Sequence, residues 1–364
     1  MTRCLKLLFV STPVGPLGSG LGGGVELTVV NLVTALTQRG HQVTIAAPEG
    51  SQISPKVTGG PSPIQIPGML QPTAHTQGRD TPAIMVDNAV LAQQWAYARQ
   101  VQENYDLIVN FAYDWLPFYL TPFFKVPIAH FVSMGSLSRV MDRAIVGIHS
   151  TYPGTLGAYT QAQIDTFPKG LTWQLLSSAI DLQQYHYCHN PGPALAWLGR
   201  ISPEKGLEDA VAAAQYTQTP LKILGKLENT DYWQSIQTAY PDAPIDYLGF
   251  VNTQQLQTIV RSCRGLLMTP RWVEAFGNVA IEALACGVPV ISYRRGGPAE
   301  IIDHGKTGWL VEPDSIEGLV QAIQQLGSID RHHCRQQAET QYSLPALGER
   351  FEQWFTTMLQ RARP

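Results

Sequence analysis

The stretch that decides the fold is residues 5–47, LKLLFVSTPVGPLGSGLGGGVELTVVNLVTALTQRGHQVTIAA. It opens on a continuous apolar run, Leu5–Ser11, which is the pattern of a strand covered on both faces of a parallel sheet. A glycine-rich loop follows, and apolar residues then recur at helical spacing over 25–39 until Gly40, the usual position of a helix C-cap. Val43–Ala47 is predicted to be the next strand. Strand, glycine loop, helix and strand form a βαβ unit, and its repetition predicts a doubly wound α/β fold.

The same alternation continues along both halves of the chain. In the first half we expect a helix over 84–103 and strands at Leu107–Asn110 and Pro127–Val132, the last of which carries His130. In the second half the predicted strands are Leu195–Leu198, Leu221–Leu224, Ile245–Leu248, Gly265–Met268, Pro289–Ser292 and Gly308–Val311. The segment 48–82 is rich in Pro, Gly, Ser and Thr, so we interpret it as a long surface excursion.

This organisation predicts two Rossmann-like domains. At 364 residues the chain is long for one domain and comfortable for two. The break is expected in the segment rich in Tyr, His, Pro and Gly near 185–193. We therefore predict a first domain over 1–187, a second over 188–344 and a final helix over 345–364.

Composition narrows the classes of function. The net charge is −3 with nine His counted as neutral, so the chain lacks the clustered basic excess that nucleic acid requires. An odd number of cysteines without a CxxC pair predicts no disulfide framework, no structural zinc and a reducing, cytoplasmic location; they are Cys4, Cys188, Cys263, Cys286 and Cys334. The first apolar run is too short for a signal peptide, and no stretch approaches the ~20 apolar residues that span a bilayer.

The strongest chemical signal runs from Glu274 to Val290, EAFGNVAIEALACGVPV. Its two acids are separated by seven residues, and the second lies inside an amphipathic helix that ends at Gly287. Backbone N–H groups of 277–279, at the start of this helix, could bind a diphosphate. Glu274 could then accept hydrogen bonds from sugar hydroxyls, and Glu282 from ribose hydroxyls. As an isolated pair, two solvated carboxylates are the more common explanation.

A second segment, Gly199–Gly206, reads GRISPEKG. It follows a predicted strand and places Arg200 and Lys205 five residues apart across a turn. Two cations at a strand end can neutralise a diphosphate leaving group without a metal, although alone they are more often a solvated turn. Because no Asp-x-Asp triplet occurs in the sequence, we expect no divalent metal on the donor phosphates. We also predict no other cofactor.

Together, in this order and at this spacing, the two segments resemble the donor-site motifs of the retaining glycosyltransferases of family 4 (glycosyl transferases group 1). That family has the GT-B fold, in which two Rossmann-like domains face each other across a cleft. Gly296–Gly308 is similar to the family's next block, and Gly22–Glu26 with the helix and Arg39–Val43 resembles its opening. The resemblance covers most of the chain, and its C-terminal motifs are specific.

The resemblance implies roles for individual residues. The catalytic set would be Arg200, Lys205, Glu274 and His130. The donor-binding set would be Gly22, Gly23, Gly24, Phe276, Gly277, Asn278, Val279 and Glu282. In this scheme the two cations bind the diphosphate, Glu274 holds the transferred sugar and Glu282 binds the ribose. A lone histidine such as His130 is otherwise as often a satisfied core or rim histidine.

The resemblance also implies the reaction. A hexose-type sugar would pass from a nucleotide-diphosphate sugar of the UDP, GDP or ADP type to a sugar, lipid or small-molecule acceptor, with retention of anomeric configuration. The first domain would bind the acceptor and the second the donor, and the final helix would cross back to the first domain. The enzyme would be a metal-independent, cytoplasmic hexosyltransferase, and contact with the inner face of the membrane stays open.

Three departures from the family pattern bear on these expectations. The family's frequent Asn-Gly-Val-Asp is replaced by Ser178-Ala-Ile-Asp181, and Pro270-Arg-Trp-Val precedes Glu274 where a Ser-rich stretch is more usual. Trp272 therefore either shapes the donor pocket or only packs. The excursion over 48–82 has no counterpart in the family pattern, so the acceptor site is left open.

Other functions are compatible with parts of the sequence. Gly18–Gly23 matches G-x-G-x-x-G between a strand and a helix, which makes a nicotinamide-dependent dehydrogenase a rival interpretation, although this motif alone is a weak signal. That fingerprint expects an acid at the end of the second strand, but this strand ends Ala46-Ala47-Pro48 and Glu49 comes only afterwards. A non-catalytic nucleotide-sugar-binding protein, an epimerase or a phosphorylase of the same architecture are further alternatives.

Overall fold

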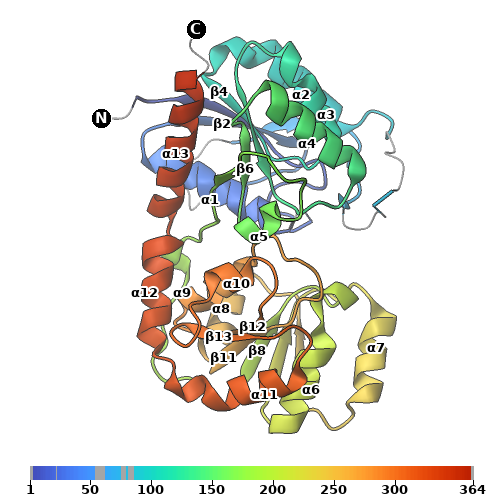
Figure 1. Cartoon of the computed structure of the whole chain (residues 1–364), viewed down its shortest axis with the longest axis vertical. Coiled ribbons are helices and arrows are strands. Elements are labelled where there is room, and N and C mark those ends of the chain that lie inside the picture. The colour runs from blue at the N-terminus through green and yellow to red at the C-terminus, as the bar shows by residue number, and fades with distance from the viewer. Residues whose placement is uncertain (1–2, 22, 54–61, 75–78, 81–85, 362–364) are drawn as a thin grey trace. The chain divides into compact units, whose positions relative to one another are not determined.

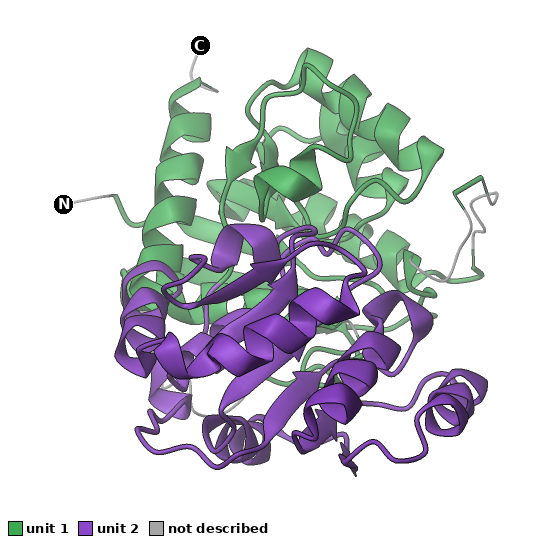
Figure 2. Cartoon of the chain, turned by 60° about the horizontal axis from the view of Figure 1, so that its bottom comes forward, with its two compact units in different colours: residues 1–178, 344–364 green, residues 179–343 purple. Residues whose placement is uncertain are grey.

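The computed structural model describes residues 3–21, 23–53, 62–74, 79–80 and 86–361 (Figure 1). The chain divides into two compact units, which Figure 2 colours separately. Unit 1 comprises Met1–Ser178 and Leu344–Pro364, and unit 2 comprises Ala179–Ser343. Among the described helices, none is long and apolar enough to cross a membrane.

The strands of unit 1 are parallel and lie in the order β3-β2-β1-β4-β5-β6-β7. They are β1 (Lys6–Val10), β2 (Gln42–Pro48), β3 (Ile64–Ile66), β4 (Leu107–Asn110), β5 (Ile128–Val132), β6 (Leu156–Ala158) and β7 (Gln174–Leu175). The central strands are buried along almost their whole length, because helices cover both faces of such a sheet. The strand order changes direction between β1 and β4, which makes the sheet doubly wound.

The helices of unit 1 are α1 (Gly24–Gln38), α2 (Val90–Val101), α3 (Trp115–Leu120), α4 (Arg139–Thr151), α5 (Gln161–Ile164) and α13 (Leu344–Arg361), with short 3₁₀ turns at η2 (Gln102–Asn104) and η3 (Thr121–Phe123). The last of these helices, α13, packs along α1. Its Glu352 accepts hydrogen bonds from Arg39 Nε at 2.8 Å and His41 Nε2 at 3.2 Å, so buried polar contacts fasten the C-terminal helix to unit 1.

Two parts of unit 1 differ from the sequence-based expectation. The excursion over 48–82 contains β3, which extends the sheet beside β2. The side chain of Gln65 supports it, accepting from Gly50 N at 2.8 Å and donating to Ser51 O at 2.9 Å. Three residues are too few to show a pattern, so this strand was not predicted.

The helix predicted over 84–103 begins later, at Val90, and continues into η2. The backbone N–H of Val90 donates to Met69 O at 3.0 Å, and Asn88 adopts a left-handed φ of 45°. The chain therefore pairs with the segment near Met69 before the helix starts. Residues 81–85 lie outside the described part of the chain.

The strands of unit 2 form a second parallel sheet in the order β10-β9-β8-β11-β12-β13. They are β8 (Leu195–Leu198), β9 (Leu221–Leu224), β10 (Ile245–Gly249), β11 (Gly265–Met268), β12 (Val290–Tyr293) and β13 (Gly308–Val311). The helices are α6 (Leu207–Thr217), α7 (Thr230–Ala239), α8 (Thr253–Arg261), α9 (Asn278–Ala285), α10 (Pro298–Ile301), α11 (Ile316–Gln325) and α12 (Arg331–Gln341), with 3₁₀ turns η4 (Leu182–Gln184), η5 (Pro203–Lys205) and η6 (Leu326–Ser328).

The division between the two compact units falls after Ser178, whereas the domain boundary predicted from the sequence lies after residue 187. The intervening segment belongs to unit 2 because its contacts are there. Ile180 N donates to Tyr342 O at 2.9 Å, and the phenol of Tyr185 donates to Glu282 Oε1 at 2.9 Å.

Candidate active site

The candidate site lies at the carboxyl edge of the unit 2 sheet. The strand order places β8 next to β11 and changes direction there, and ligands of doubly wound sheets bind at such a switch point. The loop 199–206 leaves β8, and the loop 269–277 leaves β11. Thr269 Oγ1 donates to Gly206 O at 2.7 Å and Arg271 N donates to Glu204 O at 2.9 Å. The two sequence motifs are thus joined in the folded unit.

Close packing of these loops explains the glycine that ends the first motif. Gly206 adopts a left-handed φ of 63° directly before α6. A Cβ at this position would lie 2.1 Å from the carbonyl oxygen of Thr269. Only glycine fits both conditions, and this close approach brings Lys205 to the loop that carries Glu274.

Lys205, Trp272 and Glu274 form a compact cluster. Lys205 Nζ contacts Glu274 Oε2 at 2.5 Å, and Trp272 Nε1 donates to the same oxygen at 3.0 Å. The ammonium also lies over the indole ring, 5.0 Å from its centroid, a cation–π contact. Trp272, whose role the sequence left undecided, therefore contacts both charged residues, and its ring shields them from part of the solvent.

Arg200 is held by two carboxylates. Its guanidinium pairs with Glu204 Oε1 at 3.0 Å and with Glu228, and Ser202 Oγ fixes Glu204 by donating to the same Oε1 at 2.7 Å. The Arg200 side chain retains 28% exposure. A diphosphate offers oxygen acceptors of the same kind as these carboxylates, so it can exchange with them at the guanidinium.

The segment before Glu274 is anchored from two sides. Arg271 pairs with Glu208 at 2.7 Å and with the buried Asp209 at 2.9 Å, both on α6. Arg295, after β12, donates to Pro270 O at 2.9 Å. These contacts give a structural reason for the Pro-Arg-Trp-Val departure, because Arg271 ties the loop that presents Trp272 and Glu274 to α6. Arg271 was not predicted as a site residue.

The helix α9 begins directly after Gly277, which adopts a left-handed φ of 99°. Among the described residues, no side-chain hydrogen bond caps this N-terminus, and the first turn carries the positive end of the helix dipole. Asn278 and Val279 are half-buried there. The ring of Phe276 is buried and packs against Tyr342, with centroids 6.1 Å apart. Phe276 therefore shapes this turn through its backbone, and its ring belongs to the core.

Glu282 lies farther along α9 and accepts the phenol of Tyr185 at 2.9 Å. Removal of water around this carboxyl raises the pKa of Glu282 to about 7, while the hydrogen bond from Tyr185 acts in the opposite direction. The carboxyl thus changes charge near neutral pH, which is unusual for a structural glutamate and frequent at functional sites.

This shift predicts a pH-dependent effect on stability. A raised pKa means that the ionised carboxyl destabilises the folded unit, and the cost grows as pH rises from the ordinary glutamate range through about 7. Without ligand, Glu282→Gln should raise the Tm by about 4 °C at pH 8 and change it little at pH 5. Differential scanning calorimetry measures this, with the exposed Glu317→Gln as the matched control. An equal effect at both pH values would contradict it.

His130 does not occupy the position expected of a catalytic residue. It is fully buried inside β5 and stacks on Phe118, with ring centroids 4.2 Å apart. Its Nδ1 lies 3.3 Å from Asn110 Nδ2 and its Nε2 lies 2.9 Å from Thr121 Oγ1, and burial lowers its pKa to about 3. Both ring nitrogens are engaged within unit 1. This environment favours the alternative given above, a satisfied core histidine.

The glycine-rich loop of unit 1 holds an internal carboxylate. Gly18 N and Gly20 N each donate to Glu26 Oε2 at 3.1 Å, and Glu26 is buried in the first turn of α1. These are N–H groups that a dinucleotide fingerprint would offer to a pyrophosphate, so the arrangement weighs against the dehydrogenase alternative. Of the three glycines assigned to donor binding, Gly23 and Gly24 start α1, and Gly22 lies outside the described residues.

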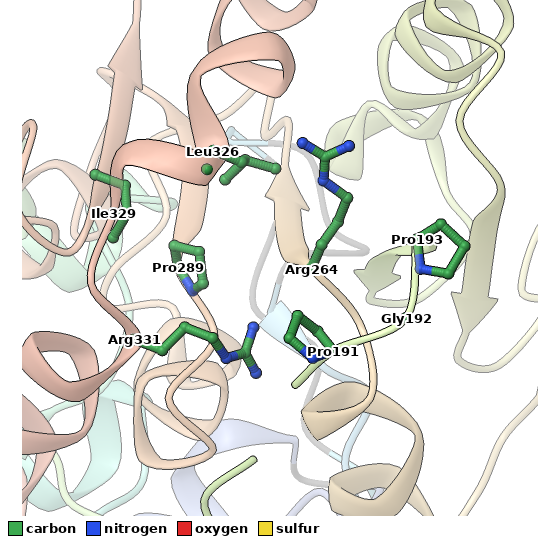
Figure 3. Close-up of a pocket in the computed structure, with 9 residues that line it drawn as sticks. Pro191, Gly192, Pro193, Arg264, Pro289, Leu326, Ile329 and Arg331 are labelled. Carbon is green, nitrogen blue, oxygen red and sulfur yellow. The ribbon is translucent and has the colours of Figure 1, made fainter. Parts of the chain in front are cut away.

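A cavity of about 390 Å³ lies at the opposite edge of the unit 2 sheet (Figure 3). Pro193 and Pro289, which line it, precede strands, so this is the amino edge. The two arginines that line it already donate hydrogen bonds to backbone carbonyls. Arg331 donates to the carbonyls of Cys188, Cys263 and Arg261, and Arg264 donates to the carbonyl of Ile323. The cavity is separate from the candidate site.

No group of three or more His, Cys, Asp or Glu side chains is placed to hold a metal within the described ranges.

Comparison with known families covers both units. Residues 190–341 match the model of the glycosyl transferases group 1, and residues 22–176 match that of glycosyltransferase family 4. This chain is a group 1 glycosyltransferase. The enzyme is 26% identical over 358 residues to a D-inositol 3-phosphate glycosyltransferase of Pseudarthrobacter chlorophenolicus, covering 86% of this chain and 84% of that protein. It is also 26% identical over 362 residues to a glycogen synthase of Mycobacterium tuberculosis, covering 88% and 85%.

Solved structures establish the fold of this glycosyltransferase as GT-B. Anabaena HepE, in complex with UDP and glucose, aligns with a TM-score of 0.75 at 18% identity, over 97% of this chain and 100% of HepE. Sucrose-phosphate synthase from Thermosynechococcus elongatus aligns with a TM-score of 0.77 at 18% identity, over 99% and 100%. The predicted GT-B fold and the predicted membership of the group 1 glycosyltransferases are therefore confirmed.

Proposed function

We propose that this glycosyltransferase moves a hexose-type sugar from a nucleoside-diphosphate sugar to its acceptor with retention of anomeric configuration. The observation that carries the proposal is the ion pair between Lys205 and Glu274 at the switch point of unit 2, with Arg200 on the same loop as Lys205. The pair joins a cation suited to a diphosphate with a carboxylate suited to sugar hydroxyls.

In the proposed mechanism the two cations act on the leaving group. Arg200 and Lys205 neutralise the charge that grows on the diphosphate as the glycosidic bond breaks, which lowers the barrier because the interaction is stronger in the transition state. Glu274 accepts hydrogen bonds from the transferred sugar, and Glu282 accepts them from the ribose. The N-terminus of α9 receives phosphate oxygens. The leaving phosphate helps to deprotonate the acceptor on the same face, so no carboxylate nucleophile is assigned.

The relatives support a nucleotide-sugar donor and leave the acceptor open. HepE has been solved with UDP-glucose and with UDP and glucose. The named relatives act in different settings, one as a D-inositol 3-phosphate glycosyltransferase and another as a glycogen synthase. We accordingly propose a UDP, GDP or ADP sugar as donor and a sugar, lipid or small molecule as acceptor, in the cytoplasm or at the inner face of the membrane, without a metal or other cofactor.

A thermal-shift screen in EDTA tests the donor. The ligands are UDP, GDP, ADP, NAD(H) and the corresponding nucleotide sugars. A ligand at ~100 times its dissociation constant should stabilise the fold by ~2.7 kcal/mol. Stabilisation by one nucleoside diphosphate without added metal would support the proposal and identify the base. Stabilisation by NAD(H) alone, or by nucleotides only when a divalent cation is added, would contradict it.

A further inference from the structure

Tyr185 connects the segment that leads into unit 2 with the donor side of that unit. Its side chain is buried, and its phenol donates to Glu282 Oε1 at 2.9 Å. Its backbone carbonyl accepts from Arg335 Nη1 at 2.8 Å, and the same nitrogen donates to Ala285 O, at the end of α9, at 2.7 Å. Both the side chain and the backbone of Tyr185 are therefore fixed against the helix that carries Glu282.

This geometry divides the hydrogen-bonding capacity of the Glu282 carboxyl. An ionised carboxylate has two oxygens that can each accept more than one hydrogen bond. The phenol occupies one site on Oε1, which restricts the rotation of the carboxyl and leaves its other oxygen for a ligand. A vicinal diol needs acceptors in a fixed orientation. The hydrogen bond from Tyr185 fixes the orientation of the carboxyl before the donor binds, which preorganises it for the ribose hydroxyls.

We propose that Tyr185 is a positioning residue for the donor: its hydroxyl orients Glu282 and favours the ionised form of the carboxyl, which accepts hydrogen bonds from the ribose 2′- and 3′-hydroxyls. The inference rests on the proposed function, in which Glu282 binds the ribose. It extends that function to a residue outside both donor motifs.

The charges around Glu282 support this role. Burial raises the pKa of Glu282 to about 7, and the Tyr185 hydrogen bond is the contact that lowers it. The Cys286 thiol, at the C-cap of α9, is neutral at pH 7, since burial raises its pKa to about 12. The other charged groups around Tyr185 and Cys286 come from the 179–187 segment, α8 and α12, namely Asp181, Arg261, Arg331 and Arg335. Without the phenol, burial acts with less opposition and the pKa of Glu282 rises further.

The test is the pH dependence of donor affinity in Tyr185→Phe. The probe is UDP-glucose, or the GDP or ADP sugar that binds in its place, because its diphosphate is esterified at both ends and does not titrate near neutral pH. We expect the dissociation constant at pH 7 to rise about fivefold, because raising the pKa of this carboxyl by about one from its value of about 7 lowers its ionised fraction from about a half to about a tenth. The dissociation constant should return toward the wild-type value at pH 9. Isothermal titration calorimetry between pH 6 and pH 9 measures this.

Two matched controls isolate the hydroxyl. Tyr187→Phe removes the phenol oxygen of a nearby, partly exposed tyrosine, and it should leave the pH dependence unchanged. The second control needs no variant: wild-type affinity for the ribonucleotide should fall below pH 7, while affinity for its 2′,3′-dideoxy analogue should not. A Tyr185→Phe profile that superimposes on the wild-type profile would overturn the inference.

Failure of the underlying proposal gives a different result. If Glu282→Gln binds the nucleotide sugar as tightly as wild type, or if the dideoxy analogue binds equally well at every pH, the carboxyl is not the ribose ligand. If Glu282→Gln weakens binding and removes its pH dependence while Tyr185→Phe changes neither, Glu282 keeps its role and only the role of Tyr185 is refuted.

Discussion

Turnover is expected to fall about 100-fold or more when Arg200 is replaced by alanine, the scale of losing one charge-stabilising donor. Arg200 follows β8 at the switch point of the unit 2 sheet, and its guanidinium is paired with Glu204 and Glu228. Alanine removes the guanidinium and leaves both carboxylates near the place where the leaving diphosphate develops charge. The loss should appear mainly in kcat, because the interaction strengthens in the transition state.

Steady-state kinetics with the donor identified by the nucleotide screen measures this effect. Arg200→Lys retains the charge without the planar fork and should give an intermediate loss. Arg261→Ala, on α8 of the same unit, is the matched control and should retain wild-type turnover. Because the pairs of Arg200 are partly exposed, the free energy of unfolding should change little in Arg200→Ala. Wild-type turnover in that variant would refute the assignment of Arg200 to the leaving group.

The pattern of apolar residues in the sequence was sufficient to predict the central strands of both sheets. Continuous apolar runs such as Leu7–Val10 predicted these strands, because a strand buried on both faces of a sheet consists almost entirely of apolar residues. The strands that were missed are short or lie toward the edge of the unit 1 sheet: β3, β6 and β7. Pairing with a neighbouring strand creates these elements, and a window of two or three residues carries no period from which they could be predicted.

The candidate site was predictable only where its residues belong to motifs. Lys205 and Glu274 were each predicted from a motif, and the structure adds their direct contact. Arg271 and Tyr185 act through partners far along the chain, Asp209 and Glu282, so no local spacing reveals them. The signal that could have pointed to Arg271 was its place in a segment that departs from the family pattern.

His130 shows a different limit of sequence-based prediction. Its position near the carboxyl end of a predicted strand suggested a side chain at the reaction centre. Sequence period reports which face of a strand a residue occupies but not what covers that face. Here Phe118 stacks on the ring and Asn110 and Thr121 engage its nitrogens, so packing by α3 and its neighbours decides the role.

Replacing Lys205 is the second change for which we expect a large effect. Lys205→Ala should lower kcat/KM about 100-fold or more, and the loss has two physical parts. The ammonium no longer neutralises the diphosphate. In addition, Glu274, whose side chain is only 17% exposed, is left without its cation and repels the incoming phosphates.

The second part can be separated by a double-mutant cycle on nucleotide binding. Lys205→Ala/Glu274→Ala should bind the nucleoside diphosphate more tightly than Lys205→Ala, with a coupling of about 0.5 to 3 kcal/mol, as for contacting residues. Isothermal titration calorimetry on the four proteins gives the coupling. The exposed Lys306→Ala, whose partner Asp303 lies 3.6 Å away, is the control and should bind like wild type.

Glu274→Gln separates nucleotide binding from sugar transfer. Without a donor, Glu274 competes for the Lys205 ammonium that the diphosphate requires, so removing its charge frees the cation. We therefore expect Glu274→Gln to bind the nucleoside diphosphate product at least as tightly as wild type, while kcat falls because the sugar loses its carboxylate acceptor. A carboxylate that competes for a diphosphate-binding cation must favour diphosphate binding when it is removed. Weaker diphosphate binding in Glu274→Gln would therefore show that Lys205 and Glu274 do not share the donor site. Strictly additive effects of Lys205→Ala and Glu274→Ala in the double-mutant cycle would show the same.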